Sequence, residues 1–248
     1  MDPQRYSTIA HTGVSICNPV SSEALDRTLA LLEPPAGAQV LDAGCGKGEL
    51  LLRLVRQRGA HGVGVDLNAA FLADARARTE ARPGPGTLEW IEGDARGHLS
   101  ALADGSLDAA ICVGATHAFG TLGDTLEALA RVVRRGGFVL VGEGYWKHTP
   151  APGYLEALGA RAEDFSDHAG NLEVGTERGW VPLFTAEASE SDWDAYEDGY
   201  AANVESFAAA HPHDPDHDAM LERIRAWREC YRRWGRSTLG FGIYLFRC

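Results

Sequence analysis

The strongest constraint on the fold is the segment 40–50, where a short apolar run enters a glycine-rich turn and then a helical pattern. Its sequence is Val-Leu-Asp-Ala-Gly-Cys-Gly-Lys-Gly-Glu-Leu, with glycine at 44, 46 and 48. Glycine adopts positive φ and lets the backbone approach a ligand closely, while the following helix presents unpaired N–H groups at its start. This pattern predicts a strand, a ligand-binding turn and a helix.

Strand and helix patterns alternate from residue 38 to residue 143. Helical patterns or turns separate five short apolar runs, at 39–42, 61–66, 88–91, 107–113 and 138–141. Such alternation predicts βαβ units and a sheet that carries helices on both faces. We therefore expect an α/β, doubly wound, mostly parallel sheet.

The segments on either side of this core have different patterns. Residues 1–37 are predicted to form an irregular arm over the first twenty residues, followed by a helix that ends at Pro34-Pro35. Residues 144–248 contain two further apolar strand patterns, at 180–188 and 239–246, which bring the sheet to seven strands. A helical insertion at about 190–236 separates these two strands, and we expect it to cover the active-site face. All of these parts are assigned to a single domain, 1–248.

Charge and composition exclude some classes of partner. The chain has 23 Lys and Arg against 35 Asp and Glu, a formal net charge of -12, which disfavours nucleic-acid binding. The arginine-rich stretch 223–236 follows the apolar stripe of a helix, so its arginines are interpreted as a solvated polar face. No apolar run is long enough to cross a bilayer and no signal sequence is evident, so we expect a cytoplasmic protein without a membrane partner. The widely separated cysteines predict reduced thiols.

The glycine turn does not fit a dinucleotide-binding fingerprint. That fingerprint requires glycine three positions after Gly46, where this chain has Glu49. Together with Asp42 at the strand end, an acid at this position suits a cationic or zwitterionic ligand better than a diphosphate. A nicotinamide-dependent oxidoreductase remains the alternative from another enzyme class.

The strand, the Asp-x-Gly-x-Gly-x-Gly turn and the acids that follow resemble the class I S-adenosylmethionine (AdoMet)-dependent methyltransferases. The resemblance covers roughly residues 38–143 and implies a Rossmann-like methyltransferase fold with AdoMet as the cofactor. It implies that Asp66 binds the ribose hydroxyls, that Asp94 binds the adenine amino group and that segment 108–115 lies against the methionine end. The cofactor residues implied in this way are Asp42, Gly44, Cys45, Gly46, Asp66, Leu67, Asp94, Ala95, Val113 and Gly114.

Each of these acids, taken alone, is as well explained as a helix N-cap or a loop carboxylate. Asp42, Asp66 and Asp94 nevertheless follow successive predicted strands. The carboxyl ends of parallel strands meet at one edge of an open α/β sheet, where such sheets bind ligands. This shared placement favours cofactor contact.

The acceptor is expected to be a small molecule. The loop after the fourth strand lacks the Asn-Pro-Pro-Tyr of amino methyltransferases that act on nucleobases or glutamine amides. His117 in this loop is the best candidate for a general base, since imidazole titrates near neutrality, but it is equally consistent with stacking near the cofactor or capping a helix. No motif requires a metal.

Further acceptor-side candidates are Glu143, Tyr145 and Trp146 after the fifth strand, and Tyr6 and His11 in the arm. Glu143 is interpreted either as a base or cation anchor, or as a structural hydrogen-bond acceptor. The aromatic residues are interpreted either as a wall for a flat or cationic substrate or as core packing. The sequence does not define the methylated atom or the oligomeric state, and a non-catalytic AdoMet sensor would carry the same cofactor motifs.

Overall fold

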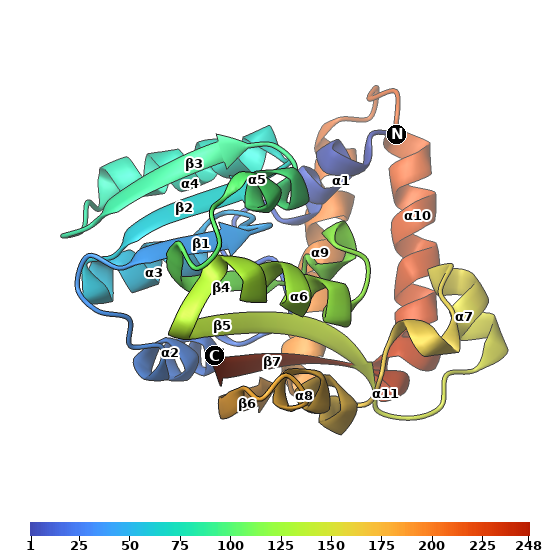
Figure 1. The fold of residues 1–248 in the computed structure, drawn as a ribbon. Coiled ribbons are helices and arrows are strands. Elements are labelled where there is room, and N and C mark those ends of the chain that lie inside the picture. The colour runs from blue at the N-terminus through green and yellow to red at the C-terminus, as the bar shows by residue number, and fades with distance from the viewer.

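Seven strands form one sheet in the computed structural model, which describes residues 1–248 (Figure 1). Their order is β3-β2-β1-β4-β5-β7-β6, and only β7 runs antiparallel to its neighbours. The strands are β1 (Gln39–Ala43), β2 (His61–Asp66), β3 (Thr87–Glu92), β4 (Leu107–Val113), β5 (Val133–Trp146), β6 (Val181–Glu187) and β7 (Leu239–Arg247). The predicted fold class, a doubly wound and mostly parallel seven-stranded sheet, is confirmed.

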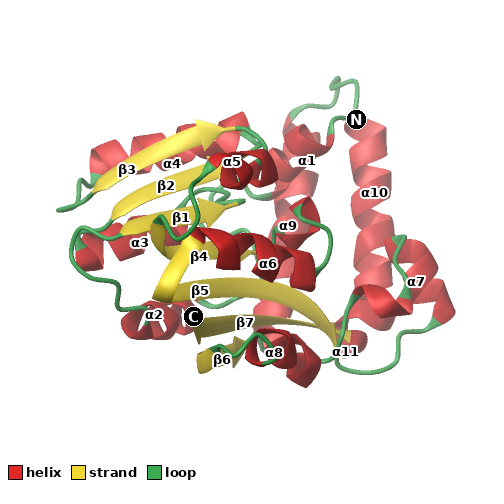
Figure 2. Ribbon diagram, viewed as in Figure 1, coloured by secondary structure: helices red, strands yellow, loops and turns green.

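Helices cover both faces of the sheet (Figure 2). Successive strand residues point to opposite faces, so Val40 packs in one apolar cluster and Leu41 in the other. The first cluster includes apolar residues of α2 (Ser22–Leu31), α3 (Glu49–Arg58) and α4 (Ala69–Ala81). The second includes those of α5 (Ala95–Ala101) and α6 (Leu122–Val132), with α8 (His168–Thr176) packed against it. The sheet is thus buried on both sides, as a parallel sheet requires.

The expectation of an irregular arm over the first twenty residues is wrong in part, because Pro3–Ala10 form helix α1. The Asp2 side chain accepts a hydrogen bond from the Gln4 N–H at 3.0 Å, and Pro3 occupies the first turn, where its missing N–H is harmless. Tyr6, Ile9 and Ala10 then form a buried face against α9. Their spacing of three and four was a helical signal, but one too short to stand out from the prolines and glycines nearby.

Strand β5 is also longer than predicted, because its antiparallel pairing with β7 extends from Phe138 to Trp146. Glu143 pairs with Gly242 and Tyr145 with Gly240. These residues therefore lie within a strand, and the expectation that they belong to a loop after it is wrong. The partner strand comes from about one hundred residues further along the chain, so local sequence did not define this boundary.

The connection between β6 and β7 contains α9 (Glu190–Ala210), α10 (His217–Cys230), a π-helical turn over Tyr231–Gly235 and the short α11 (Arg236–Thr238). These elements lie with α1 and α7 (Pro152–Leu158) beyond the carboxyl ends of the parallel strands (Figure 1). Short 3₁₀ turns occur at Thr116–Ala118 and Ala162–Asp164. No helix combines the length and apolar character needed to cross a membrane.

Candidate functional site

The glycine turn after β1 is fixed by close backbone packing. Gly44 has φ +77°, and a Cβ built on it would lie 2.2 Å from the Cβ of Ala115. The Gly46 N–H donates a hydrogen bond to Asp66 Oδ2 at 2.7 Å, which joins the turn to the end of β2. Only glycine satisfies both the positive φ and the close approach at position 44.

Asp66 is held by backbone groups on both of its oxygens. Besides the Gly46 bond, Oδ1 accepts from the Asn68 N–H at 2.8 Å. Asn68 in turn caps α4 by accepting from the N–H groups of Ala70 and Phe71. A carboxylate oxygen can accept more than one hydrogen bond, so the oriented Asp66 retains capacity for a ligand's donors.

Asp42 is the most unfavourably placed acid of the site. Its side chain lies at the end of β1 with only 2% exposure. Burial, and then the nearby negative charge of Asp66, raise the pKa of Asp42 to about 8. No protein group donates a hydrogen bond to it. A buried acid in this state is stabilised by a ligand that brings positive charge or a hydrogen-bond donor.

Asp94 follows β3 and caps α5, accepting from Arg96 N at 3.2 Å and Gly97 N at 2.9 Å. The N-cap interpretation is therefore correct for this acid, and it does not exclude ligand contact, because Asp94 also lines the cavity described next. Leu67 lies beside the same cavity with 57% of its surface exposed. An exposed leucine next to a carboxylate is suited to a flat ring that carries an amino group.

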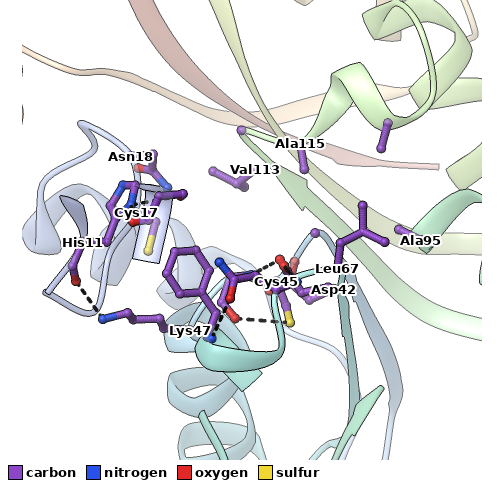
Figure 3. A pocket seen from close by; sticks show the side chains of 18 of the residues that line it. His11, Cys17, Asn18, Asp42, Cys45, Lys47, Leu67, Ala95, Val113 and Ala115 are labelled. Carbon is purple, nitrogen blue, oxygen red and sulfur yellow. Dashed lines mark hydrogen bonds between the residues drawn. The ribbon is translucent and has the colours of Figure 1, made fainter. Parts of the chain in front are cut away.

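A cavity of about 370 Å³ brings these elements together at the carboxyl ends of the strands (Figure 3). All of the residues predicted to contact a cofactor line it: Asp42, Gly44, Cys45, Gly46, Asp66, Leu67, Asp94, Ala95, Val113 and Gly114. His11 and His117 line it as well, and the exposed His117 has no hydrogen-bond partner in the protein.

The N-terminal arm forms one wall of this cavity, which the sequence analysis largely missed. Cys17 and Asn18 line the cavity alongside His11 (Figure 3). The buried Lys47 holds the arm in place, because its Nζ donates to the His11 carbonyl at 2.7 Å and lies 3.1 Å from Asp74. A lysine between two motif glycines was visible in the sequence, but its partner in the arm was not.

His11 is buried, and both of its ring nitrogens have hydrogen-bond partners. Its Nδ1 lies 2.8 Å from the Ser7 carbonyl, which can only accept, so Nδ1 carries the proton. Its Nε2, 3.1 Å from Tyr196 Oη, is then left as an acceptor. Burial lowers the pKa of His11, and the charge of Lys47 lowers it further.

The expectation that Tyr145, Trp146 and Tyr6 form one aromatic wall is wrong. The Tyr145 hydroxyl donates to Glu187 of β6, and the Trp146 Nε1 donates to the Ala162 carbonyl at 2.8 Å. Tyr6 packs between α1 and α9. Tyr145 and Trp146 are consecutive in β5, so alternation places their rings on opposite faces of the sheet, and neither ring lines the cavity.

Two acids also differ from their expected roles. Glu143 does not line the cavity. Burial raises the pKa of its carboxyl, and hydrogen bonds with Thr116 and the Gly144 N–H act in the opposite direction. This placement favours the structural interpretation of Glu143. Glu49 pairs with Arg53 and Arg78, so its charge is neutralised within the protein and is not free for a cationic ligand.

The chain matches a family model described as a methyltransferase domain over residues 40–137. It is similar to a crystal structure of a SAM-dependent methyltransferase from Geobacter sulfurreducens in complex with S-adenosylhomocysteine, with 30% identity, TM-score 0.89 and coverage of 98% of this chain and 97% of that one. A Thiobacillus denitrificans enzyme with the same description and ligand has 31% identity, TM-score 0.88 and coverage of 99% of both chains. The malonyl-[acyl-carrier protein] O-methyltransferase of Salmonella typhimurium is 30% identical over 91% of this chain and 88% of its own length.

Proposed function

The chain belongs to the class I S-adenosylmethionine-dependent methyltransferases, and from that premise we propose that it methylates a small-molecule acceptor. The observation that carries the proposal is the cavity of about 370 Å³ at the carboxyl ends of the strands. A cavity of this size accommodates a cofactor and the reacting end of a small molecule. The net charge of -12 disfavours a nucleic-acid acceptor.

The cavity residues fit AdoMet by their chemistry. Asp66, held by two backbone N–H groups, is proposed to accept both ribose hydroxyls. Asp94 and the exposed Leu67 are proposed to bind the amino group and a face of the adenine. Asp42, which lacks a hydrogen-bond donor in the protein, is proposed to face the cationic methionine end.

When bound, the cofactor supplies a methyl group on a sulfonium, which is already an activated leaving group. The chain therefore has to position the acceptor in line with this methyl group and exclude water. His117 is proposed as the group that removes a proton from acceptors that carry one, because its imidazole is unpaired at the cavity. His11 is proposed to orient the arm, since both of its ring nitrogens already have partners.

Asp66→Asn tests the cofactor assignment. The amide nitrogen cannot accept a hydrogen bond, so the ribose loses part of its binding and the glycine turn loses part of its support. We expect S-adenosylhomocysteine (AdoHcy) affinity to fall by about a hundredfold in isothermal titration calorimetry, corresponding to the roughly 1–3 kcal/mol of a lost charged hydrogen bond.

Asp104→Asn is the matched control, because Asp104 is an exposed carboxylate, paired with Arg131, that does not line the cavity. Its AdoHcy affinity should equal that of the unmodified protein. Near-normal AdoHcy binding by Asp66→Asn would contradict the ribose assignment, and tighter binding of a nicotinamide dinucleotide than of AdoHcy would contradict the cofactor assignment.

Methyl-labelled AdoMet tests the acceptor class. The protein is incubated with a cell extract separated into a dialysable fraction, a nucleic-acid fraction and a protein fraction. Label transferred to the dialysable fraction supports the proposal, whereas label confined to either of the other fractions overturns it.

A further inference from the structure

A second cavity, of about 670 Å³, lies among α1, α7, α9 and α10 and is mostly apolar. Its walls include the aromatic side chains of Tyr6, Tyr196, Tyr200 and Trp227, together with Glu197 and Arg223. The helices that form it stand beyond the carboxyl ends of the strands, on the same side of the sheet as the first cavity (Figure 1). Its volume is within the range of cavities that bind small organic molecules.

Two buried polar groups of this cavity have unused hydrogen-bonding capacity. Glu197 is only 4% exposed, and its Oε2 accepts from Trp227 Nε1 at 2.6 Å, while no protein group donates to Oε1. The Tyr6 hydroxyl is buried without any partner. Polar groups of buried side chains are nearly always paired, so the free oxygen of Glu197 at the cavity wall points to a ligand that donates a hydrogen bond.

The second cavity adjoins the first across a single pair of side chains. His11 lines the first cavity and Tyr196 lines the second, and their polar atoms are 3.1 Å apart. The Tyr200 ring also meets the His11 ring edge to face, with centroids 5.2 Å apart. A molecule bound in the second cavity would therefore lie next to the arm that encloses the cofactor.

The charged residues around this cavity, Arg223 and Glu197, favour a neutral hydrogen-bond donor over a cation. The Arg223 guanidinium lies 4.3 Å from the Tyr6 ring centroid and forms no ion pair with any carboxylate. Its positive charge opposes the entry of a second cation, while Glu197 requires a donor. Burial raises the pKa of Glu197 to about 7, which further indicates a site suited to a neutral donor. The four aromatic rings favour a flat apolar body.

We infer that this second cavity binds the non-reacting body of the acceptor, which is flat, largely apolar and uncharged and donates a hydrogen bond from oxygen or nitrogen to Glu197. The assignment of this ligand as the acceptor rests on the proposed function. The binding site itself depends only on the chemistry of its walls.

Naphthol and its methyl ether, methoxynaphthalene, are suitable probes, because they share a flat ring system and differ in the donated O–H. Each is titrated into the full protein by calorimetry, with and without saturating AdoHcy. We expect naphthol to bind at least tenfold more tightly than methoxynaphthalene, since a buried acceptor left without a donor costs about 1–3 kcal/mol. Equal affinities, or no binding of either probe, would overturn the inference.

Glu197→Gln assigns the effect to one side chain. Its amide keeps the shape and can still accept from Trp227, but presents N–H groups where Oε1 was free. Naphthol affinity should fall at least tenfold and methoxynaphthalene affinity should be unchanged. Glu205→Gln is the matched control, because Glu205 lies on the same helix with a side chain 44% exposed and paired to Arg228, and it should bind both probes normally.

Thermal melting verifies that each variant is folded. If Glu197→Gln does not fold, Ala226→Phe fills part of the cavity that Ala226 lines, and both probes should lose at least tenfold in affinity; unchanged affinity of both probes overturns the inference. Failure of AdoHcy to bind the unmodified protein would contradict the proposed function without affecting the comparison between the two probes.

Discussion

Asp42 combines a stability penalty with a role in ligand binding. Its carboxyl has no hydrogen-bond donor in the protein, and its pKa is raised from 3.8 to about 8. The folded protein thus binds this proton more tightly than the unfolded chain does. The associated stability is complete below the unfolded pKa and is lost as the pH rises from 3.8 towards 8.

Asp42→Asn should therefore stabilise the unliganded protein at alkaline pH while weakening cofactor binding. We expect the free energy of unfolding to rise by about 1–3 kcal/mol at about pH 9, and by less at about pH 5. Urea unfolding at both pH values, with AdoMet titrations alongside, measures the two effects. A variant that is less stable than the unmodified protein at alkaline pH would contradict this account of Asp42.

Gly44 has no room for a side chain. Gly44→Ala places a Cβ 2.2 Å from that of Ala115 at φ +77°, and the backbone term alone costs about 1–2 kcal/mol. We expect a lower urea midpoint and loss of AdoHcy binding. Gly199→Ala, in α9, is the control, because its Cβ meets nothing within 4 Å and alanine favours a helix. Equal stability of the two variants would argue against close packing at the turn.

One buried lysine, Lys47, joins the arm and α1 to the cofactor cavity. Lys47→Met removes the bonds to the His11 carbonyl and Asp74 and leaves both without this partner. We expect AdoHcy affinity to fall about tenfold and the unfolding free energy to fall by about 1–3 kcal/mol.

Lys147→Met is the matched control for this variant. Lys147 also donates to a backbone carbonyl, that of Arg236 at 2.6 Å, but it lies outside the cavity. Its AdoHcy affinity should remain normal. If both lysine variants bind AdoHcy normally, the arm does not contribute to the cofactor site.

The sequence predicted the residues of the first cavity better than those of the second. Asp42, Asp66 and Asp94 follow local strand patterns, so their convergence at one sheet edge was predictable from topology. Tyr145 was misplaced because the length of β5 depends on pairing with the distant β7. Glu197 was missed because nothing in the pattern of α9 distinguishes one buried acid from the many exposed ones; only the packing of α10 against it does so.

At the scale of the whole molecule, the charge distribution opposes binding to polyanions. Two arginines of α10 and its C-terminal end, Arg228 and Arg236, pair with acids of α9, whereas Arg223, Arg225, Arg232 and Arg233 form no ion pair, and the last three line one surface hollow. The predicted solvated face therefore carries both paired and unpaired arginines. The net charge of -12 still opposes binding to polyanions, although the unpaired arginines form a local basic surface.

We expect no retardation of duplex DNA or transfer RNA by this protein in an electrophoretic mobility assay near physiological salt. A basic DNA-binding protein of similar mass serves as the positive control. A salt-sensitive shift at micromolar protein would contradict the interpretation and would reopen a nucleic-acid acceptor.

The placement of β7 between β5 and β6 sets an order of events during folding. β6 pairs with no strand other than β7, although the whole α9 and α10 excursion separates the two in sequence. Until β7 inserts, β6 has no edge to join, and its backbone groups stay open to intermolecular pairing. Closing so long a loop is slow, so Pro182, which cannot donate to a ladder, is well placed to protect the nascent chain from aggregation.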